Sequence, residues 1–104
     1  MRVKGAVVVI TGAAGGIGRA TALRFARTGA HVVLAGRRTE ALEEVAARCR
    51  SRGARALAVP TDITDAAAVD RLAQRTVEQF GRIDVWVNCA SVGLFASVAD
   101  SPLE

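Results

Sequence analysis

Residues 6–18 decide the fold of this chain and read Ala-Val-Val-Val-Ile-Thr-Gly-Ala-Ala-Gly-Gly-Ile-Gly. The first five residues are apolar and mostly β-branched, which predicts a buried strand. A glycine-rich run follows at once and opens a segment with the apolar spacing of a helix. A strand, a glycine loop and a helix in this order form the unit that binds the pyrophosphate of a dinucleotide.

The glycines of this loop meet the physical requirements of such a site. A tight turn needs a residue without a Cβ atom, which Gly12 supplies. Gly16 leaves room for the backbone to approach a pyrophosphate, and Gly18 lets the helix pack closely on its strand. The helix N-terminus then offers free N–H groups and a partial positive charge to the phosphates. The residues of the loop expected to contact the cofactor are Gly12, Ala14, Gly15, Gly16, Ile17 and Gly18.

Two other interpretations of the loop fit the sequence less well. A Walker-type phosphate loop ends in Gly-Lys-Ser/Thr, and no lysine follows these glycines. A purely structural strand–helix turn is also rich in small residues. The apolar run before the loop and the helix after it favour the dinucleotide site over such a turn.

The rest of the chain alternates between strand-like and helix-like segments. Apolar runs without clean alternation are typical of parallel strands that are covered on both faces. Strands that alternate with helices predict a doubly wound α/β sheet, and right-handed crossovers suggest the strand order 3-2-1-4. The predicted strands are 6–10, 31–35, 56–59 and 84–87. The predicted helices begin near Gly16, after Thr39 and around Thr64 or Asp65, and they close at Gly29, Gly53 and Gly81.

Apolar stripes at helical spacing predict the buried faces of the second and third helices. The stripe of the second helix is Leu42, Val45, Ala46 and Cys49. The stripe of the third helix is Val69, Leu72, Ala73, Thr76, Val77 and Phe80.

The composition fits one small globular domain. The chain has 104 residues, 51% of them hydrophobic, and no apolar run approaches the ~20 residues that cross a bilayer. The N-terminus lacks the apolar stretch and cleavage site of a secretory signal, so we expect a cytoplasmic protein with no membrane partner. Cys49 and Cys89 lack Cys-x-x-Cys spacing, and we expect reduced thiols rather than a redox or metal pair.

The formal net charge of +4 comes mainly from arginines. A basic protein can bind nucleic acid through the phosphates. These arginines are spread over several predicted elements without interleaved aromatic residues, which is typical of a solvated surface. We therefore expect no nucleic-acid partner, since a nucleic-acid-binding domain is suggested by charge alone.

Two motifs resemble those of a known family. Residues 11–18, Thr-Gly-x-x-x-Gly-Ile-Gly, resemble the cofactor loop of the short-chain dehydrogenase/reductase family. Residues 88–91, Asn-Cys-Ala-Ser, resemble the family's Asn-Asn-Ala-Gly element and differ from it at the second and fourth positions. The resemblance implies a Rossmann-type fold and hydride transfer between a nicotinamide and a carbonyl or alcohol substrate. It also implies that Asn88 braces the strand ends beside the cofactor and that Ala90 lets the backbone lie against it.

The residues after the second predicted strand bear on the choice of cofactor. An acidic residue there would accept hydrogen bonds from the ribose hydroxyls of NAD, but Ala35-Gly36 stands in its place. Arg37 and Arg38 follow, and the planar fork of arginine suits a 2′-phosphate. We therefore expect NADP in preference to NAD. The alternative is that both arginines are solvated residues in front of a helix.

Two further residues are assigned by their position. Asp62, with Ile63 beside it, follows the third predicted strand and matches the family's Asp that contacts the adenine edge. An Asp after a strand also caps turns, so both roles stay open. His31 opens the second strand without an acid or a nucleophile beside it, and we expect it to be structural.

The family's catalytic residues have no counterpart in this sequence. The family moves the proton with the tyrosine of a Tyr-x-x-x-Lys element, whereas this chain has no tyrosine, and its one lysine, Lys4, precedes the first strand. We therefore assign no catalytic residue and expect no metal.

The end of the chain, Ser101-Pro102-Leu103-Glu104, has the capping-box form of a helix start. We expect residues 1–104 to be the N-terminal part of one nucleotide-binding domain, from an enzyme that forms a homo-oligomer as the family commonly does. The alternative is a non-catalytic nucleotide-binding or interaction module.

Overall fold

Strands and helices alternate along residues 3–89, the part of the chain that the computed structural model describes. The elements are β1 (Val7–Thr11), α1 (Gly16–Arg27), β2 (His31–Gly36), α2 (Thr39–Ser51), β3 (Ala56–Pro60), α3 (Ala66–Phe80) and β4 (Val85–Asn88). The predicted cofactor contact at Ala90 and the capping box at 101–104 lie outside the described residues.

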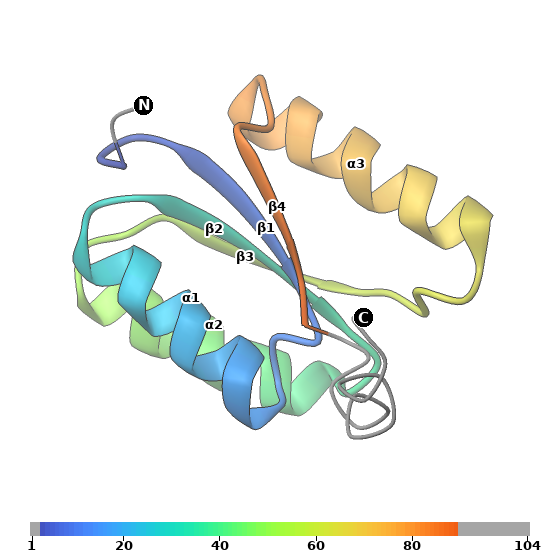
Figure 1. Ribbon diagram of the computed structural model, residues 1–104, viewed down its shortest axis with the longest axis horizontal. Coiled ribbons are helices and arrows are strands. Elements are labelled where there is room, and N and C mark those ends of the chain that lie inside the picture. Colours follow the sequence, from blue (N-terminus) through green and yellow to red (C-terminus); the bar gives the residue numbers. More distant parts are fainter. Residues whose placement is uncertain (1–2, 90–104) are drawn as a thin grey trace, which may run out of the picture.

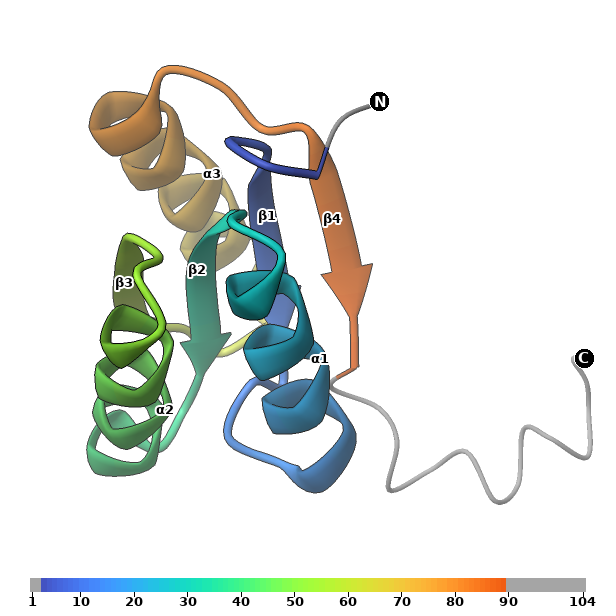
Figure 2. The ribbon, with the colours of Figure 1, turned by 90° about the vertical axis from the view of Figure 1, so that its left-hand side faces the viewer.

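The strands form one parallel sheet in the order β3-β2-β1-β4. This arrangement confirms the predicted doubly wound α/β fold and its strand order. Helices α1 and α2 cover one face of the sheet, and α3 covers the other (Figures 1 and 2). The central strand β1 pairs with β2 from Val7–His31 onward and with β4 from Val8–Val85 onward.

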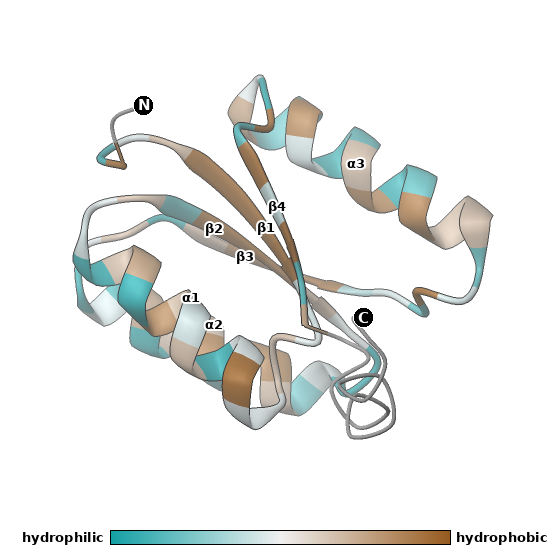
Figure 3. Ribbon diagram, viewed as in Figure 1, coloured by the Kyte–Doolittle hydropathy of each residue, from teal (hydrophilic) through white to brown (hydrophobic). Residues whose placement is uncertain are grey.

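Side chains of β1 alternate between two cores. Val8 and Ile10 pack in the cluster with α1 and α2, whereas Val9 packs in the cluster with α3. All three side chains are fully buried, because helices lie on both faces of the sheet. Figure 3 shows the resulting run of hydrophobic residues along the middle of the sheet. This double burial explains why the strand sequence has no hydrophobic–polar alternation.

The larger core lies between the sheet and the α1–α2 layer. The predicted stripe of α2 is buried at every position, namely Leu42, Val45, Ala46 and Cys49. α1 contributes the small buried residues Ala22 and Ala26, which allow its backbone to approach the sheet closely. Burial raises the pKa of the Cys49 thiol, so this cysteine stays protonated and packs as an apolar side chain.

The predicted stripe of α3 is wrong at Val77. Leu72 and Thr76 are buried, but Val77 is 47% exposed. Each residue advances a helix by about 100°, so Val77 points away from the sheet when Thr76 points towards it. Within residues 3–89, α3 is the only helix on this face, and no second helix packs over Val77. The buried Thr76 hydroxyl is satisfied because it donates to the Leu72 carbonyl at 2.8 Å.

The C-terminal ends of the helices agree with the predicted glycines, whereas α2 begins at Thr39 itself with Arg38 as its N-cap. Gly29, Gly53 and Gly81 lie at or just after the three C-caps with φ of +90°, +91° and +87°, a region that favours glycine. Of the two predicted N-caps of α3, Asp65 is the one used. Its side chain accepts a hydrogen bond from the N–H of Ala67 at 3.0 Å.

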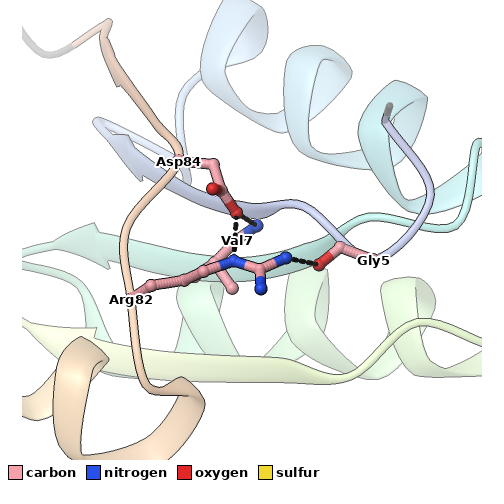
Figure 4. A network of polar contacts seen from close by, with 4 residues as sticks. All are labelled: Gly5, Val7, Arg82 and Asp84. Carbon is pink, nitrogen blue, oxygen red and sulfur yellow. Dashed lines mark hydrogen bonds and ion pairs between the residues drawn. The ribbon is translucent and has the colours of Figure 1, made fainter. Parts of the chain in front are cut away.

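A polar network that was not predicted joins the start of β4 to the start of β1 (Figure 4). Asp84 Oδ2 accepts hydrogen bonds from the Val7 N–H and from Arg82 Nε, both at 2.8 Å. The Asp84 N–H donates to the Val7 carbonyl at 2.9 Å, and Arg82 Nη2 donates to the Gly5 carbonyl at 3.1 Å. Asp84 therefore precedes β4 and anchors it, whereas the sequence pattern placed this residue within the strand.

This network predicts an acid-sensitive contribution to stability. The hydrogen bonds from Arg82 and Val7 lower the pKa of Asp84 from its ordinary value of 3.8. A carboxyl group with a lowered folded-state pKa stabilises the fold above its unfolded pKa, and that contribution is lost as the pH falls through the folded-state pKa. We expect Asp84→Asn to lower the thermal unfolding midpoint at neutral pH, and this difference from wild type to shrink below pH 3.8.

Thermal unfolding followed by circular dichroism at a series of pH values measures this difference. The matched control is Asp70→Asn, because Asp70 lies exposed on α3 and makes no side-chain hydrogen bond within the described residues. An Asp84→Asn effect of the same size at neutral and acid pH would contradict the assignment.

Candidate functional site

The ends of the four parallel strands meet at one edge of the sheet. The chain runs from β1 to β2 and β3 on one side, and then returns to β4 on the other side of β1. In open α/β sheets, ligands bind beyond the carboxyl ends of the strands where the strand order reverses. In this chain that point lies between β1 and β4, next to the start of α1 (Figure 2).

The glycine loop between β1 and α1 has the geometry expected from its sequence. Gly12 has φ of +67°, and the Gly15 N–H donates to the Gly12 carbonyl at 3.1 Å, which closes a tight turn. A Cβ atom on Gly18 would overlap the Gly12 carbonyl oxygen and lie 2.7 Å from its carbonyl carbon. Gly18 is therefore required for close packing, as predicted. It packs against the loop that follows the strand rather than against the strand itself.

The N-terminus of α1 is open to an anion. Gly15 is its N-cap and has no side chain to bond the first helical N–H groups, and the first turn holds no acidic residue. A Cβ atom on Gly16 would meet nothing within 4 Å, so this position faces open space. Ile17 is 57% exposed next to it. Backbone donors and the positive end of the helix dipole are thus presented together at this edge.

Arg37 and Arg38 lie at the neighbouring end of β2. Both are exposed, and Arg38 is the N-cap of α2 without a side-chain capping bond. The Thr61 N–H donates to the Gly36 carbonyl at 2.7 Å, which holds the ends of β2 and β3 together. This pairing places Arg37 Nε 4.0 Å from Asp62 Oδ1. Two residues predicted separately as cofactor contacts therefore lie side by side.

Asp62 caps the turn after β3. Its Oδ1 accepts hydrogen bonds from the Thr64 hydroxyl at 2.6 Å and from the Thr64 N–H at 2.9 Å. These two bonds and the charge of Arg37 lower the pKa of Asp62, so the side chain is ionised at neutral pH. The turn role left open by the sequence is thus present, while Oδ2 makes no hydrogen bond within residues 3–89. Ile63, 37% exposed, follows it at the surface.

Asn88 ends β4 opposite Thr11, the last residue of β1. The Thr11 hydroxyl donates to Asn88 Oδ1 at 2.9 Å, and the indole Nε1 of Trp86 donates to the same oxygen at 3.1 Å. The Cys89 N–H continues the pairing by donating to the Thr11 carbonyl at 3.1 Å. Asn88 therefore braces the two strand ends, as the resemblance implies. The bonds from Thr11 and Trp86 were not predicted, because strand pairing and side-chain rotamers bring these groups together.

The structure gathers the predicted site residues of the described range at a single edge and leaves His31 at the opposite one. His31 opens β2 and stacks on Phe80 with ring centroids 5.7 Å apart. Among residues 3–89 there is no group of three His, Cys, Asp or Glu side chains that could hold a metal ion. In the same part of the chain, no helix combines the length and the apolar character needed to cross a membrane.

The tight contact of Gly18 predicts a large effect of one methyl group. We expect Gly18→Ala to destabilise the fold by roughly 1–3 kcal/mol or more, because the rigid backbone of the loop cannot move aside. Gly16→Ala is the matched control, since the same methyl group would enter open space. Chemical unfolding in urea measures both free energies. Equal stabilities of the two variants would contradict this packing.

Comparisons with known proteins agree with this geometry. A family model described as short chain dehydrogenase matches residues 6–104. Meso-2,3-butanediol dehydrogenase from Serratia marcescens is 43% identical over 104 residues, which is 100% of this chain and 41% of that protein.

Solved structures show the same likeness. A short chain dehydrogenase from Mycobacterium smegmatis is 44% identical with a TM-score of 0.79, and the match covers 84% of this chain and 37% of that one. A xylitol dehydrogenase with NAD+ bound is 38% identical with a TM-score of 0.79, over 83% of this chain and 33% of that one. The chain spans less than half the length of the curated relatives it matches.

Proposed function

The chain belongs to the short-chain dehydrogenase family, and on that premise we propose that it forms the cofactor-binding part of an NADP-dependent oxidoreductase. The observation that carries the proposal is the uncapped N-terminus of α1 above the glycine loop. It offers backbone donors, a dipole and open space for a pyrophosphate at the edge where such sheets bind ligands.

The predicted site residues can be assigned to the pyrophosphate and to the two halves of the dinucleotide. The pyrophosphate would lie on the loop residues Gly12, Ala14, Gly15, Gly16, Ile17 and Gly18. The adenosine half would lie over the ends of β2 and β3, near Arg37, Arg38, Asp62 and Ile63. The nicotinamide half would then extend towards Asn88 and Ala90 after β4. This direction follows from the ribose position after the second strand of such folds.

The preference for the 2′-phosphate of NADP is supported by charge. Arg37 and Arg38 are exposed cations at the uncapped start of α2, and no acidic residue occupies the Ala35-Gly36 position. Asp62 lies near Arg37, but their separation of 4.0 Å leaves the Arg37 side chain 73% exposed and able to bind a second anion. Arginine forks pair strongly with phosphate. The choice between NAD and NADP depends on the side chains after the second strand, so a relative with NAD+ bound does not decide the preference of this chain.

We propose hydride transfer between the nicotinamide of NADP and a carbonyl or alcohol substrate as the activity of the whole protein, with residues 1–104 as the N-terminal part of one nucleotide-binding domain. When bound, the nicotinamide supplies or accepts the hydride. The described residues hold and orient the cofactor, while the family's tyrosine and lysine would supply the proton. We also propose that the whole protein forms a homo-oligomer.

Isothermal titration of the 104-residue chain with NADP+ and NAD+ tests cofactor binding. We expect tighter binding of NADP+, because its 2′-phosphate adds a charge-assisted contact. Absence of binding by either dinucleotide at millimolar concentration would contradict the proposed function.

Replacing Arg37 separates the cofactor preference from general charge effects. We expect Arg37→Asp to weaken NADP+ binding about tenfold or more, because a hydrogen bond to a charged group contributes about 1.5–3 kcal/mol. Binding of NAD+ should be kept or improved, since the new carboxylate can accept bonds from ribose hydroxyls. Arg48→Asp, the same charge change in the last turn of α2, is the control. The assignment is wrong if both variants change the NADP+ and NAD+ affinities alike.

The purified 104-residue chain should show no dehydrogenase turnover, because it contains no tyrosine to act as the family's proton donor. The absorbance of the reduced nicotinamide, followed with a set of small ketones and alcohols, measures this. Turnover above the rate without protein would show that another residue of the chain supplies the proton.

A further inference from the structure

Trp86 makes a specific polar contact at the end of β4. It is the only tryptophan of the chain, and its ring packs at the margin of the α3-side core. Its indole N–H lies 3.1 Å from Oδ1 of Asn88, the residue two positions further along the same strand. Side chains two residues apart project from the same face of a strand, so this bond runs along β4 towards its carboxyl end.

The chemistry of the indole determines how the Asn88 amide is turned. An indole nitrogen can only donate a hydrogen bond, so the amide must present its oxygen to Trp86. The Thr11 hydroxyl donates to the same oxygen at 2.9 Å. Oδ1 is thus occupied by two donors, while Nδ2 donates to no residue of the described range. Asn88 is an exposed residue, so its amide N–H groups are the polar atoms it can offer to a ligand at this edge.

The orientation of the Asn88 amide matters for ligand binding because of where this amide lies. Thr11 and Asn88 are paired at the carboxyl ends of β1 and β4, where the strand order reverses. Cys89 follows where the resembling motif has a second asparagine, so Asn88 carries the one side-chain amide of residues 88–91. A ligand that lies over β1 and β4 meets a donor there only while the amide keeps its orientation.

We propose that Trp86 is a positioning residue for the nicotinamide half of the dinucleotide. Its indole N–H holds the Asn88 amide with Nδ2 turned towards that half of the ligand. The adenosine half would lie over the ends of β2 and β3, on the other side of β1 from β4, and its binding should not depend on Trp86. This inference rests on the proposed function.

Trp86→Phe tests the inference, because it keeps an aromatic ring for packing and deletes the N–H donor. Calorimetric titrations of the 104-residue chain with NADP+ and with 2′,5′-ADP, which carries only the adenosine half, provide the readout. We expect NADP+ to bind about three- to tenfold more weakly to the variant, in keeping with the loss of one neutral hydrogen bond. The affinity for 2′,5′-ADP should stay unchanged, a result that a general loss of folding could not produce.

A second variant separates the loss of the N–H donor from the effect of packing a smaller ring. Replacement of Trp86 by 3-benzothienylalanine keeps the size of the side chain and removes only the donor, and it should reproduce the Trp86→Phe pattern. Equal weakening of both ligands, or wild-type affinity for NADP+ in this variant, would overturn the role of Trp86. Failure of the wild-type chain to bind either ligand would instead overturn the proposed function.

Discussion

The close contact between Gly18 and the backbone of Gly12 is the constraint on which the candidate site depends. Only a residue without a Cβ atom allows α1 to begin against the loop that leaves β1. This contact directs the free N–H groups of the helix towards the sheet edge where the strand order reverses. The anion-binding character of the site therefore comes from backbone geometry, and the side chains around it adjust which ligand fits.

The strand ends are tied together by short polar contacts that keep this edge in place. Thr11 and Asn88 join β1 to β4, and the Gly36 carbonyl joins β2 to the turn after β3. At the opposite end of the sheet, Asp84 and Arg82 hold the start of β4 against β1. A parallel sheet has no hairpin turns to set its register, so such contacts help to align strands that are distant in sequence.

Most of the fold could be predicted from sequence patterns that involve only neighbouring residues. The apolar runs, the glycines after the helices and the stripe of α2 depend on neighbouring residues, and the structure agrees with them. Val77 was misassigned because the spacing of apolar residues does not show how much of the surface of α3 the sheet covers. The bonds of Asp84 to Val7 and of Trp86 to Asn88 were missed because strand pairing and rotamers bring those groups together. For Asp62, the sequence left two roles open, and only the turn to Thr64 is visible in the structure.

In the proposed complex, a dinucleotide binds on the start of α1 with its adenosine half towards the end of β2. Mapping of backbone amide chemical shifts by NMR, during titration of the 104-residue chain with NADP+, tests it most directly. We expect the largest shifts at residues 15–18, followed by those at Arg37 and Arg38. Shifts confined to the opposite edge, around His31 and Phe80, would contradict it, as would unchanged spectra at millimolar NADP+.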